Sequence, residues 1–329
     1  MCLRPITIPN RRYDFRCGID KMYLTVPCGE CPECRSNKIN DYFVRLYYEW
    51  QRYYYNKGSV WFVTLSYNDL DLPYIDVHSP ESKAIEKVFS MRFPNIAYPC
   101  FDKGHVRDFL DRLLKLDRLP YFITKNIPSL RDAKGVPYNT VLGADIKHFC
   151  VCEYGHTTHR PHYHLLIFFP FIASAGAMKK LFEFCWSNRK HSGDVPEFVK
   201  LGLRNAIADG RDNYECQEWF AYKSVTPRKT LTYFMHKHGF AMFSYKHGAQ
   251  VLNPIGCKYL CKYLFKDEHF YKQPFMNEYS DLIKSLPAIA GIPETPLKKM
   301  VHHVKDTLPF FLVSNGFGAD LEKEFHQNP

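Results

Sequence analysis

Residues 160–169 read RPHYHLLIFF, two histidines followed by five apolar residues. An apolar run of this length predicts a β-strand in the middle of a sheet, which is a rigid platform for a site. Because side chains alternate along a strand, His162 and His164 would share one face and Tyr163 would lie on the other. Two imidazoles at this spacing can bind one metal ion. The sequence therefore predicts a central strand with a metal-binding pair.

A histidine pair at this spacing is weak support by itself, because the chain has 15 histidines. The same pattern occurs again at His236-Lys237-His238. No apolar strand follows the second pair, so we expect it at the surface or facing DNA. The pair that has partners elsewhere in the chain is the better candidate.

The first pair has such a partner in the preceding strand. Residues 145–154 read DIKHFCVCEY and predict a strand, and the polar residues 155–161 predict the loop of an antiparallel hairpin. Glu153 would then face the start of the next strand. Two imidazoles and one carboxylate leave positions open for water and a phosphate oxygen. The same donors suit zinc in a hydrolase or iron in an oxygenase.

Other residues of the hairpin are alternative candidates for the third ligand. His156 and His159 lie in the intervening loop and could replace Glu153. A loop positions a ligand less well than a strand, so Glu153 is the better choice. The alternative is that Glu153 binds no metal and is a solvent-exposed residue of the hairpin.

A doubled Tyr-x-x-Lys pattern lies about a hundred residues downstream. Asn253-Pro254 predicts the start of a helix, with an asparagine cap and proline in the first turn. Tyr259 and Tyr263 are four residues apart and would project from one face of it. A row of lysines follows the same spacing: Lys258, Lys262 and Lys266. Like charges on one row repel, which indicates an anionic ligand such as a phosphate.

Tyrosine can act as a nucleophile toward phosphate when its surroundings favour the phenolate. Its ordinary pKa is about 10, and nearby lysines lower it. A metal ion would polarise the scissile phosphate, and attack would leave a covalent phosphotyrosine. Two tyrosines permit two successive transesterifications. The alternative is a pair of core aromatics, because the chain has 23 tyrosines.

A third motif lies near the N-terminus. Cys28, Cys31 and Cys34 form a C-x2-C-x2-C triplet whose spacing suits zinc, with Cys2 or Cys17 as the fourth ligand. The alternative is a reduced, cysteine-rich turn that caps the next helix.

Composition indicates a soluble protein with a polyanionic partner. The chain has 329 residues, a net charge of +10 and 16% aromatic residues, a combination that suits single-stranded nucleic acid. A basic protein without such a partner is the alternative. No segment has the apolar length of a membrane span, and the first residues lack the apolar core of a signal peptide. We therefore expect a cytoplasmic protein with mostly reduced cysteines.

The remaining patterns favour an α+β fold, an antiparallel sheet with helices packed on it. Three domains are expected: a cysteine-rich segment and amphipathic helix over 1–58, a catalytic domain over 59–270 and an extension over 271–329, with 191–253 as an insertion. Strands are predicted over 59–67, 121–124 and 239–245, and helices over 33–55, 105–116, 176–190 and 279–286. Residues 70–103 predict a long irregular connection.

Three segments in this order resemble the motifs of a known family. They are residues 62–69 (FVTLSYND), residues 152–155 (CEYG) with 160–165 (RPHYHL), and residues 259–266 (YLCKYLFK). They resemble the rolling-circle replication initiators of the HUH endonuclease superfamily, in particular those of gokushovirus-like microviruses, small phages with single-stranded DNA. Residues 28–35 resemble a cysteine-rich segment near the N-terminus of those proteins.

The resemblance implies an RRM-like palm with the histidine pair on a central strand. The implied activity is site-specific nicking of a single strand at a viral origin through 5′-phosphotyrosine, followed by rejoining. His162, His164 and Glu153 would bind Mg²⁺ or Mn²⁺, Tyr259 and Tyr263 would be the nucleophiles, and Lys262 and Lys266 would assist them. Lys258, Arg160 and Tyr163 are expected to contact DNA. The implied partners are single-stranded and origin DNA and the host helicase and polymerase, in the cytoplasm of a bacterial host.

Three alternatives stay open. A transposase or relaxase would use the same chemistry in another role. A non-catalytic protein that binds single-stranded DNA would use the same basic, aromatic surface without a nick. A two-histidine, one-carboxylate iron oxygenase would not need the tyrosine pair.

Overall fold

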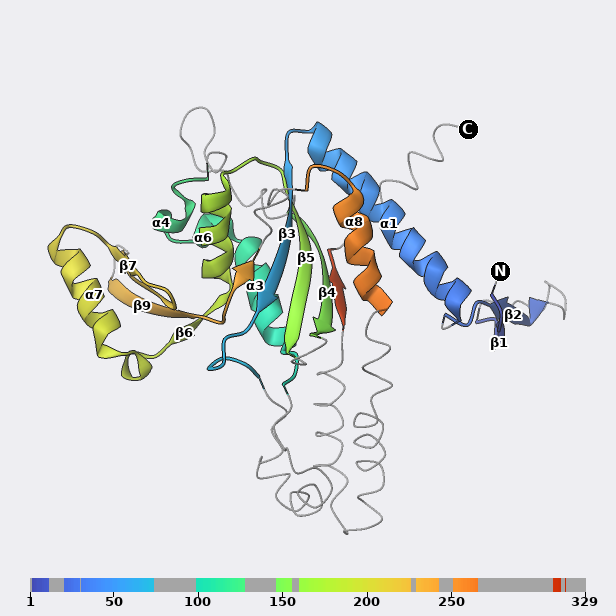
Figure 1. The fold of residues 1–329 in the computed structure, drawn as a ribbon, viewed down its shortest axis with the longest axis horizontal. Helices are drawn as coiled ribbons and strands as arrows, with labels where there is room; N and C mark the ends of the chain where they lie inside the picture. Colours follow the sequence, from blue (N-terminus) through green and yellow to red (C-terminus); the bar gives the residue numbers. More distant parts are fainter. Residues whose placement is uncertain are drawn as a thin grey trace, which may run out of the picture.

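A computed structural model describes residues 2–11, 21–29, 31–73, 99–127, 146–155, 160–225, 229–242, 251–265, 310–314 and 317 (Figure 1). The elements in chain order are β1 (Ile6–Pro9), β2 (Tyr23–Val26), α1 (Pro32–Tyr55), β3 (Ser59–Ser66), α3 (Lys103–Leu113), η3 (Leu116–Arg118), α4 (Tyr121–Thr124), β4 (Lys147–Tyr154), β5 (Pro161–Phe169), α6 (Ala175–Cys185), β6 (Ser187–Lys190), η5 (Ser192–Asp194), α7 (Glu197–Ala208), β7 (Asn213–Glu215), β8 (Trp219–Val225), β9 (Thr230–Lys237), β10 (Ala241–Met242), α8 (Ile255–Cys261), η6 (Lys262–Phe265) and β11 (Phe311–Val313).

The main sheet has five strands in the order β10-β3-β5-β4-β11, with every neighbouring pair antiparallel. β5, the strand with the histidine pair, is the central one. The predicted α+β class, central strand and β4–β5 hairpin are therefore confirmed. The strand predicted over 239–245 is present as the short edge strand β10.

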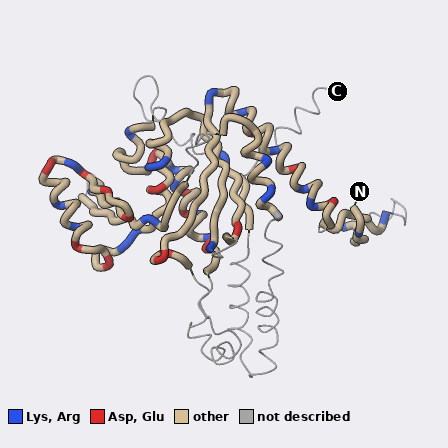
Figure 2. Tube along the Cα trace, viewed as in Figure 1, with Lys and Arg blue, Asp and Glu red and all other residues tan. Residues whose placement is uncertain are grey.

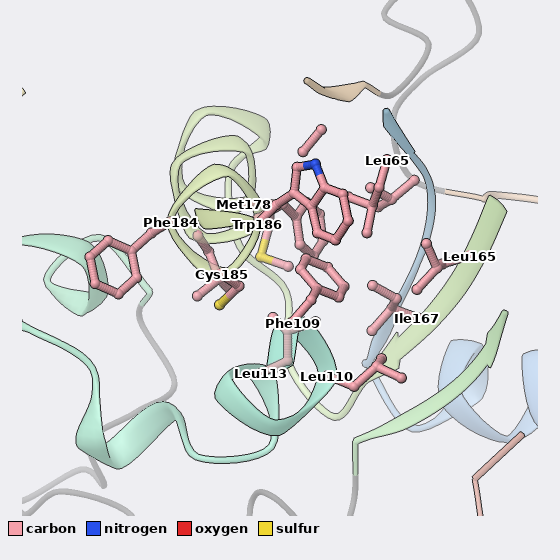
Figure 3. Close-up of a cluster of buried hydrophobic side chains, with 14 of the residues drawn as sticks. Leu65, Phe109, Leu110, Leu113, Leu165, Ile167, Met178, Phe184, Cys185 and Trp186 are labelled. Carbon is pink, nitrogen blue, oxygen red and sulfur yellow. The ribbon is translucent and has the colours of Figure 1, made fainter. Parts of the chain in front are cut away.

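Helices cover both faces of this sheet. Leu165 and Ile167 of β5 pack with α3 and α6 on one face, whereas Leu166 and Phe168 pack with α1 and α8 on the other. Figure 1 shows α3 and α6 on one side of the strands and α8 and α1 on the opposite side. Figure 3 shows Leu165 and Ile167 facing Phe109 across the first of these interfaces. The alternation of β5 thus divides its side chains between two cores.

A second sheet, with four antiparallel strands in the order β6-β9-β8-β7, follows α6. Helix α7 packs on it through Val199 and Leu203, which contact Trp219 and Phe234 in a small core of their own. This sheet spans 187–237 and overlaps the insertion predicted over 191–253. The chain leaves the sheet after β9, and β10 joins the main sheet.

Two local predictions were wrong. Residues 121–124 form one helical turn instead of a strand, because the N–H of Ile123 bonds to the Pro120 carbonyl at 2.9 Å and two adjacent residues, Phe122 and Ile123, are buried. The helix predicted over 176–190 ends at Cys185, and residues 187–190 pair with β9 as β6.

The other two helix predictions on described residues hold with small shifts. Helix α1 covers 32–55, and α3 begins at Lys103 because the Asp102 carboxylate accepts bonds from Gly104 and His105 N–H groups. The helix predicted over 279–286 and most of the connection predicted over 70–103 lie outside the described residues. In the described part of the chain, no helix is both long and apolar enough to cross a membrane.

The central strand should dominate stability. Leu165→Ala removes a fully buried side chain between β3, β4 and α6, so we expect a loss of about 2–5 kcal/mol in the free energy of unfolding. Leu70→Ala makes the same chemical change at a side chain that is 80% exposed and should alter stability by less than about 0.5 kcal/mol. Urea unfolding of both variants measures the difference, and equal losses would contradict the packing described above.

Candidate functional site

The histidine pair and Glu153 lie on one face of the main sheet. In the β4–β5 ladder Glu153 is directly opposite His162, and in the β3–β5 ladder Thr64 is directly opposite His164. His164 and Glu153 are buried, with 8% and 7% of their surface exposed. This face also contacts α8 and η6, where the tyrosine pair lies.

Both ring nitrogens of His164 are hydrogen-bonded. Nε2 lies 2.9 Å from Oε1 of Glu153, and Nδ1 lies 2.9 Å from Oγ1 of Thr64. A neutral ring with its proton on Nε2 satisfies both bonds, since it donates to the carboxylate and accepts from the hydroxyl. These two partners fix the plane of the ring. Thr64 was not predicted as a site residue from the sequence. The only hint is that it carries a hydroxyl within an otherwise apolar strand.

His162 is the more accessible member of the pair. Its ring is 6.4 Å from that of His164, centroid to centroid, at an interplanar angle of 23°. Burial, and then the neighbouring His164, lower the pKa of His162, although the charge of Glu153 opposes them. Its imidazole is therefore neutral near pH 7, the form that binds a metal.

The tyrosine pair meets the histidine strand directly. The ring of Tyr263 stacks on that of His164 with centroids 4.3 Å apart and an interplanar angle of 19°. The Tyr263 hydroxyl donates a hydrogen bond of 2.5 Å to the Tyr259 hydroxyl. Tyr259 is 48% exposed, whereas Tyr263 is 7% exposed. Folding thus brings the two halves of the predicted site together.

Packing against α1 fixes the position of the tyrosine helix. The helix begins at Ile255, so the N-cap residue is Pro254 and not the predicted Asn253. The Asn253 side chain still accepts a bond from Ile255 N–H just before the helix, which becomes 3₁₀ after Cys261. Cys257 and Leu260 are buried against α1 and the sheet. Trp50 of α1 donates from Nε1 to the Val251 carbonyl at 2.8 Å, just before α8. The nucleophile candidates therefore rest on a packed support.

The electrostatics of the two tyrosines differ. Burial, and then the contact with Tyr259, raise the pKa of Tyr263, so its phenolate is disfavoured. Lys262 places Nζ 5.9 Å from the centre of the Tyr259 ring, and Lys258 is exposed on the same helix. Lys266 lies outside the described residues. Positive charge is thus close to Tyr259, the more exposed tyrosine.

Two predicted DNA contacts have different outcomes. Arg160 is partly exposed, pairs with Asp69 at 2.5 Å and donates to the Tyr67 carbonyl, so it connects the hairpin to residues 67–69. The prediction for Tyr163 was wrong, because its ring is fully buried and its hydroxyl bonds to that of Tyr67. Strand alternation points Tyr163 into the core with α3 and α6, away from the histidine face.

The surface position expected for His236 and His238 was also wrong. Both are buried, with 4% and 2% of their surface exposed, at the end of β9. His236 donates from Nδ1 to Oδ2 of Asp71 at 2.5 Å, and His238 Nδ1 lies 3.8 Å from the same oxygen. Lys190 of β6 pairs with the other oxygen of Asp71 at 3.3 Å. The second histidine pair therefore belongs to a polar cluster that joins the two sheets.

The N-terminal cysteines form a cluster able to bind a metal such as zinc. The Sγ atoms of Cys2, Cys28, Cys31 and Cys34 all lie within 4.8 Å of one another. In the described ranges no other group of three or more His, Cys, Asp or Glu ligand atoms is as close, so His162, His164 and Glu153 share a face but are less tightly gathered. Cys17 lies outside the described residues.

Comparison with protein-family models, with curated proteins and with solved structures gave no match for this chain. The arrangement of the residues is therefore the basis for any functional conclusion.

The Asp71 cluster should stabilise the fold in a pH-dependent way. Burial alone would raise the pKa of Asp71, but the hydrogen bond and charge of His236 outweigh it and lower this pKa to about 2. Asp71→Asn should therefore cost about 2 kcal/mol near pH 7. Because a depressed carboxyl pKa stabilises the fold only above the unfolded value of about 3.9, the difference from wild type should shrink as the pH falls from 4 toward 2.

Urea unfolding at several pH values tests this expectation. Asp111→Asn is the matched control, because the Asp111 side chain is 66% exposed and pairs with Lys115 at the surface. A cost for Asp71→Asn no larger than that of the control would contradict the role of the cluster.

Proposed function

We propose that this chain is a metal-dependent nuclease that cleaves and rejoins single-stranded DNA through tyrosine, a rolling-circle replication initiator with an RRM-like HUH palm. The observation that supports this most directly is the stacking of Tyr263 on His164 with the Tyr263–Tyr259 hydrogen bond. These two contacts place the two candidate nucleophiles next to the two imidazoles and the carboxylate of Glu153. A tyrosine pair that belonged only to the core would not need one member to be 48% exposed.

The proposed reaction is a transesterification. The oxygen of one tyrosine attacks the phosphorus of a DNA phosphodiester and loses its proton. A Tyr–O–P bond forms with the 5′ end of one fragment, the P–O3′ bond breaks, and the released 3′ oxygen takes up a proton. The phosphodiester energy is retained in the phosphotyrosine, so attack by a 3′ hydroxyl can reverse the step and rejoin a strand.

The donors on β4 and β5 are of the chemical kind that binds a divalent cation. The contact of 2.9 Å between His164 Nε2 and Glu153 Oε1 shows that two of the three donors converge, and His162 lies opposite Glu153 on the same face. We infer Mn²⁺ ahead of Mg²⁺, since imidazole nitrogen is a softer donor than the oxygens that Mg²⁺ prefers. Such an ion supplies a Lewis acid for a phosphate oxygen. His164 would give up its bond to Glu153 when it binds the ion.

The structure favours Tyr259 as the first nucleophile. Tyr259 is about half exposed, and its hydroxyl accepts the hydrogen bond that Tyr263 donates. The hydrogen bond from Tyr263 and the Lys262 ammonium close to the Tyr259 ring would offset the negative charge that develops during the attack. Tyr263, buried and with a raised pKa, would act second, after the first strand has moved.

Basic residues offer a path for the DNA backbone. Lys258 and Lys262 are exposed beside the tyrosines. Lys and Arg also recur along α1, the helix that packs against α8 (Figure 2). Phosphate contacts of this kind position a strand without reading its sequence. We propose a viral origin strand as the substrate and the bacterial host's replication proteins as partners, in the host cytoplasm.

The two tyrosines can be tested separately with 3′-labelled single-stranded oligonucleotides of randomised sequence and Mn²⁺ on a denaturing gel. Tyr259→Phe should abolish the first covalent adduct. Tyr263→Phe removes one hydrogen bond to a charged group, so it should slow adduct formation by about tenfold without abolishing it.

Tyr121→Phe serves as the control, since Tyr121 is exposed on α4, on the face of the sheet opposite the histidines. An adduct that survives the combined change Tyr259→Phe and Tyr263→Phe would exclude the proposed chemistry. Tight DNA binding by wild type with no adduct at any Mn²⁺ concentration would favour a binding protein instead.

The Glu153 carboxylate should determine how much Mn²⁺ the reaction needs. Glu153→Gln keeps a hydrogen-bonding side chain next to His164 but removes the charge, so half-maximal adduct formation should need about tenfold more Mn²⁺ or more. Glu197→Gln, on the exposed surface of α7, should leave the requirement unchanged. An identical Mn²⁺ titration for Glu153→Gln and wild type would remove Glu153 from the metal site.

A further inference from the structure

Four thiols from three separate segments meet at the N-terminal end of α1. Cys2 lies near the start of the chain, Cys28 follows β2, and Cys31 and Cys34 lie at the first turn of α1. The Sγ of Cys2 is 3.5 Å from that of Cys28 and 3.8 Å from that of Cys31, and Cys28 and Cys34 are 3.9 Å apart. Every pair in the set lies within 4.8 Å.

These spacings match a single tetrahedral ion. A zinc–sulfur bond is about 2.3 Å long, so the sulfurs of a tetrahedral site are about 3.8 Å apart. A disulfide would need about 2.05 Å between one pair, and the four thiols are all free. An iron–sulfur cluster would need room for its own iron and sulfide atoms between the thiolates, which sulfurs this close do not leave.

The backbone around the sulfurs is arranged for thiolates. The N–H of Cys28 donates to Sγ of Cys2 at 3.3 Å, and the N–H of Cys31 donates to Sγ of Cys28 at 3.3 Å. Cys31 is also the N-cap residue of α1, where the helix dipole favours negative charge.

The described residues of the same segment bury little apolar surface. All four residues of β1 and the first three of β2 are exposed, and among the described strands these two pair only with each other. Figure 1 shows this hairpin at the end of α1, away from the main sheet. An isolated two-stranded hairpin is marginally stable in water, so the segment needs another source of folding energy.

We propose that Cys2, Cys28, Cys31 and Cys34 bind one zinc ion as a closed, structural site. The ion joins the chain start, the end of the hairpin and the first turn of α1. With four protein sulfurs the coordination shell is full, so no position is open for water or substrate. The site is independent of the tyrosine chemistry and holds whether or not the chain cleaves DNA.

The test is metal analysis of the full chain purified without chelators. We expect close to one zinc per chain, lost in Cys28→Ser and in Cys31→Ser. Cys216→Ser, at a partly exposed thiol between β7 and β8, should keep the zinc. Tyr259→Phe with Tyr263→Phe should keep it as well, which separates this site from the nuclease proposal.

Replacing zinc with Co²⁺ in the wild-type chain gives a readout that does not rely on variants that fail to fold. Four thiolates should give strong sulfur-to-cobalt charge-transfer absorption with tetrahedral d–d bands, and Cys2→Ser should weaken the charge-transfer band. Folded wild type that binds neither zinc nor Co²⁺ would overturn the proposal. So would iron in place of zinc, or equal zinc loss in Cys216→Ser.

Discussion

The two-faced alternation of β5 is the constraint on which the rest of the structure depends. Odd-numbered residues from Tyr163 to Phe169 enter the core with α3 and α6, and the even-numbered residues face α1 and α8. A shift of the register by one residue would bury His162 and His164 in the first core and turn Tyr163 toward α8. Pairing with β3 and β4 on both sides holds the register, so the same hydrogen bonds that build the sheet also orient the histidines.

Hydrogen bonds between the polar groups on that face offset part of the cost of burying them. His164 bonds to Glu153 on one side and Thr64 on the other, and the Tyr263 ring covers it. A buried carboxylate without partners would be costly, and the hydrogen bond with His164 lowers that cost. The arrangement keeps the donors rigid and leaves Tyr259 and His162 as the members that a ligand can approach.

The sequence was sufficient to predict those elements whose pattern lies in neighbouring residues. The apolar run of β5, its hairpin with β4 and the period of α1 were all predicted from residues close in the chain. The burial of His236 was not, because its partner Asp71 lies 165 residues away. The strand β6 was missed for the same reason, since the 39 residues 191–229 separate it from its partner β9. The sequence could only suggest that Tyr263 and His164 belong to one site. Their contact depends on the folded chain.

Helix α1 extends from the cysteine cluster to the nucleophile helix, and the spacing along it determines whether the two depend on each other. The side chains of α1 that pack against the core on this face begin near Ile39 and Tyr42, and the Tyr42 ring lies 5.4 Å from that of Phe149 in β4. Leu46 follows, and its carbonyl accepts a hydrogen bond from Sγ of Cys257 in α8. Cys34 lies only five residues before Ile39, about 7.5 Å along a helix. The spacing is therefore short. The cysteine cluster organises the hairpin at one end of α1, and Leu46, Trp50 and Tyr53 support the tyrosine helix from the same scaffold.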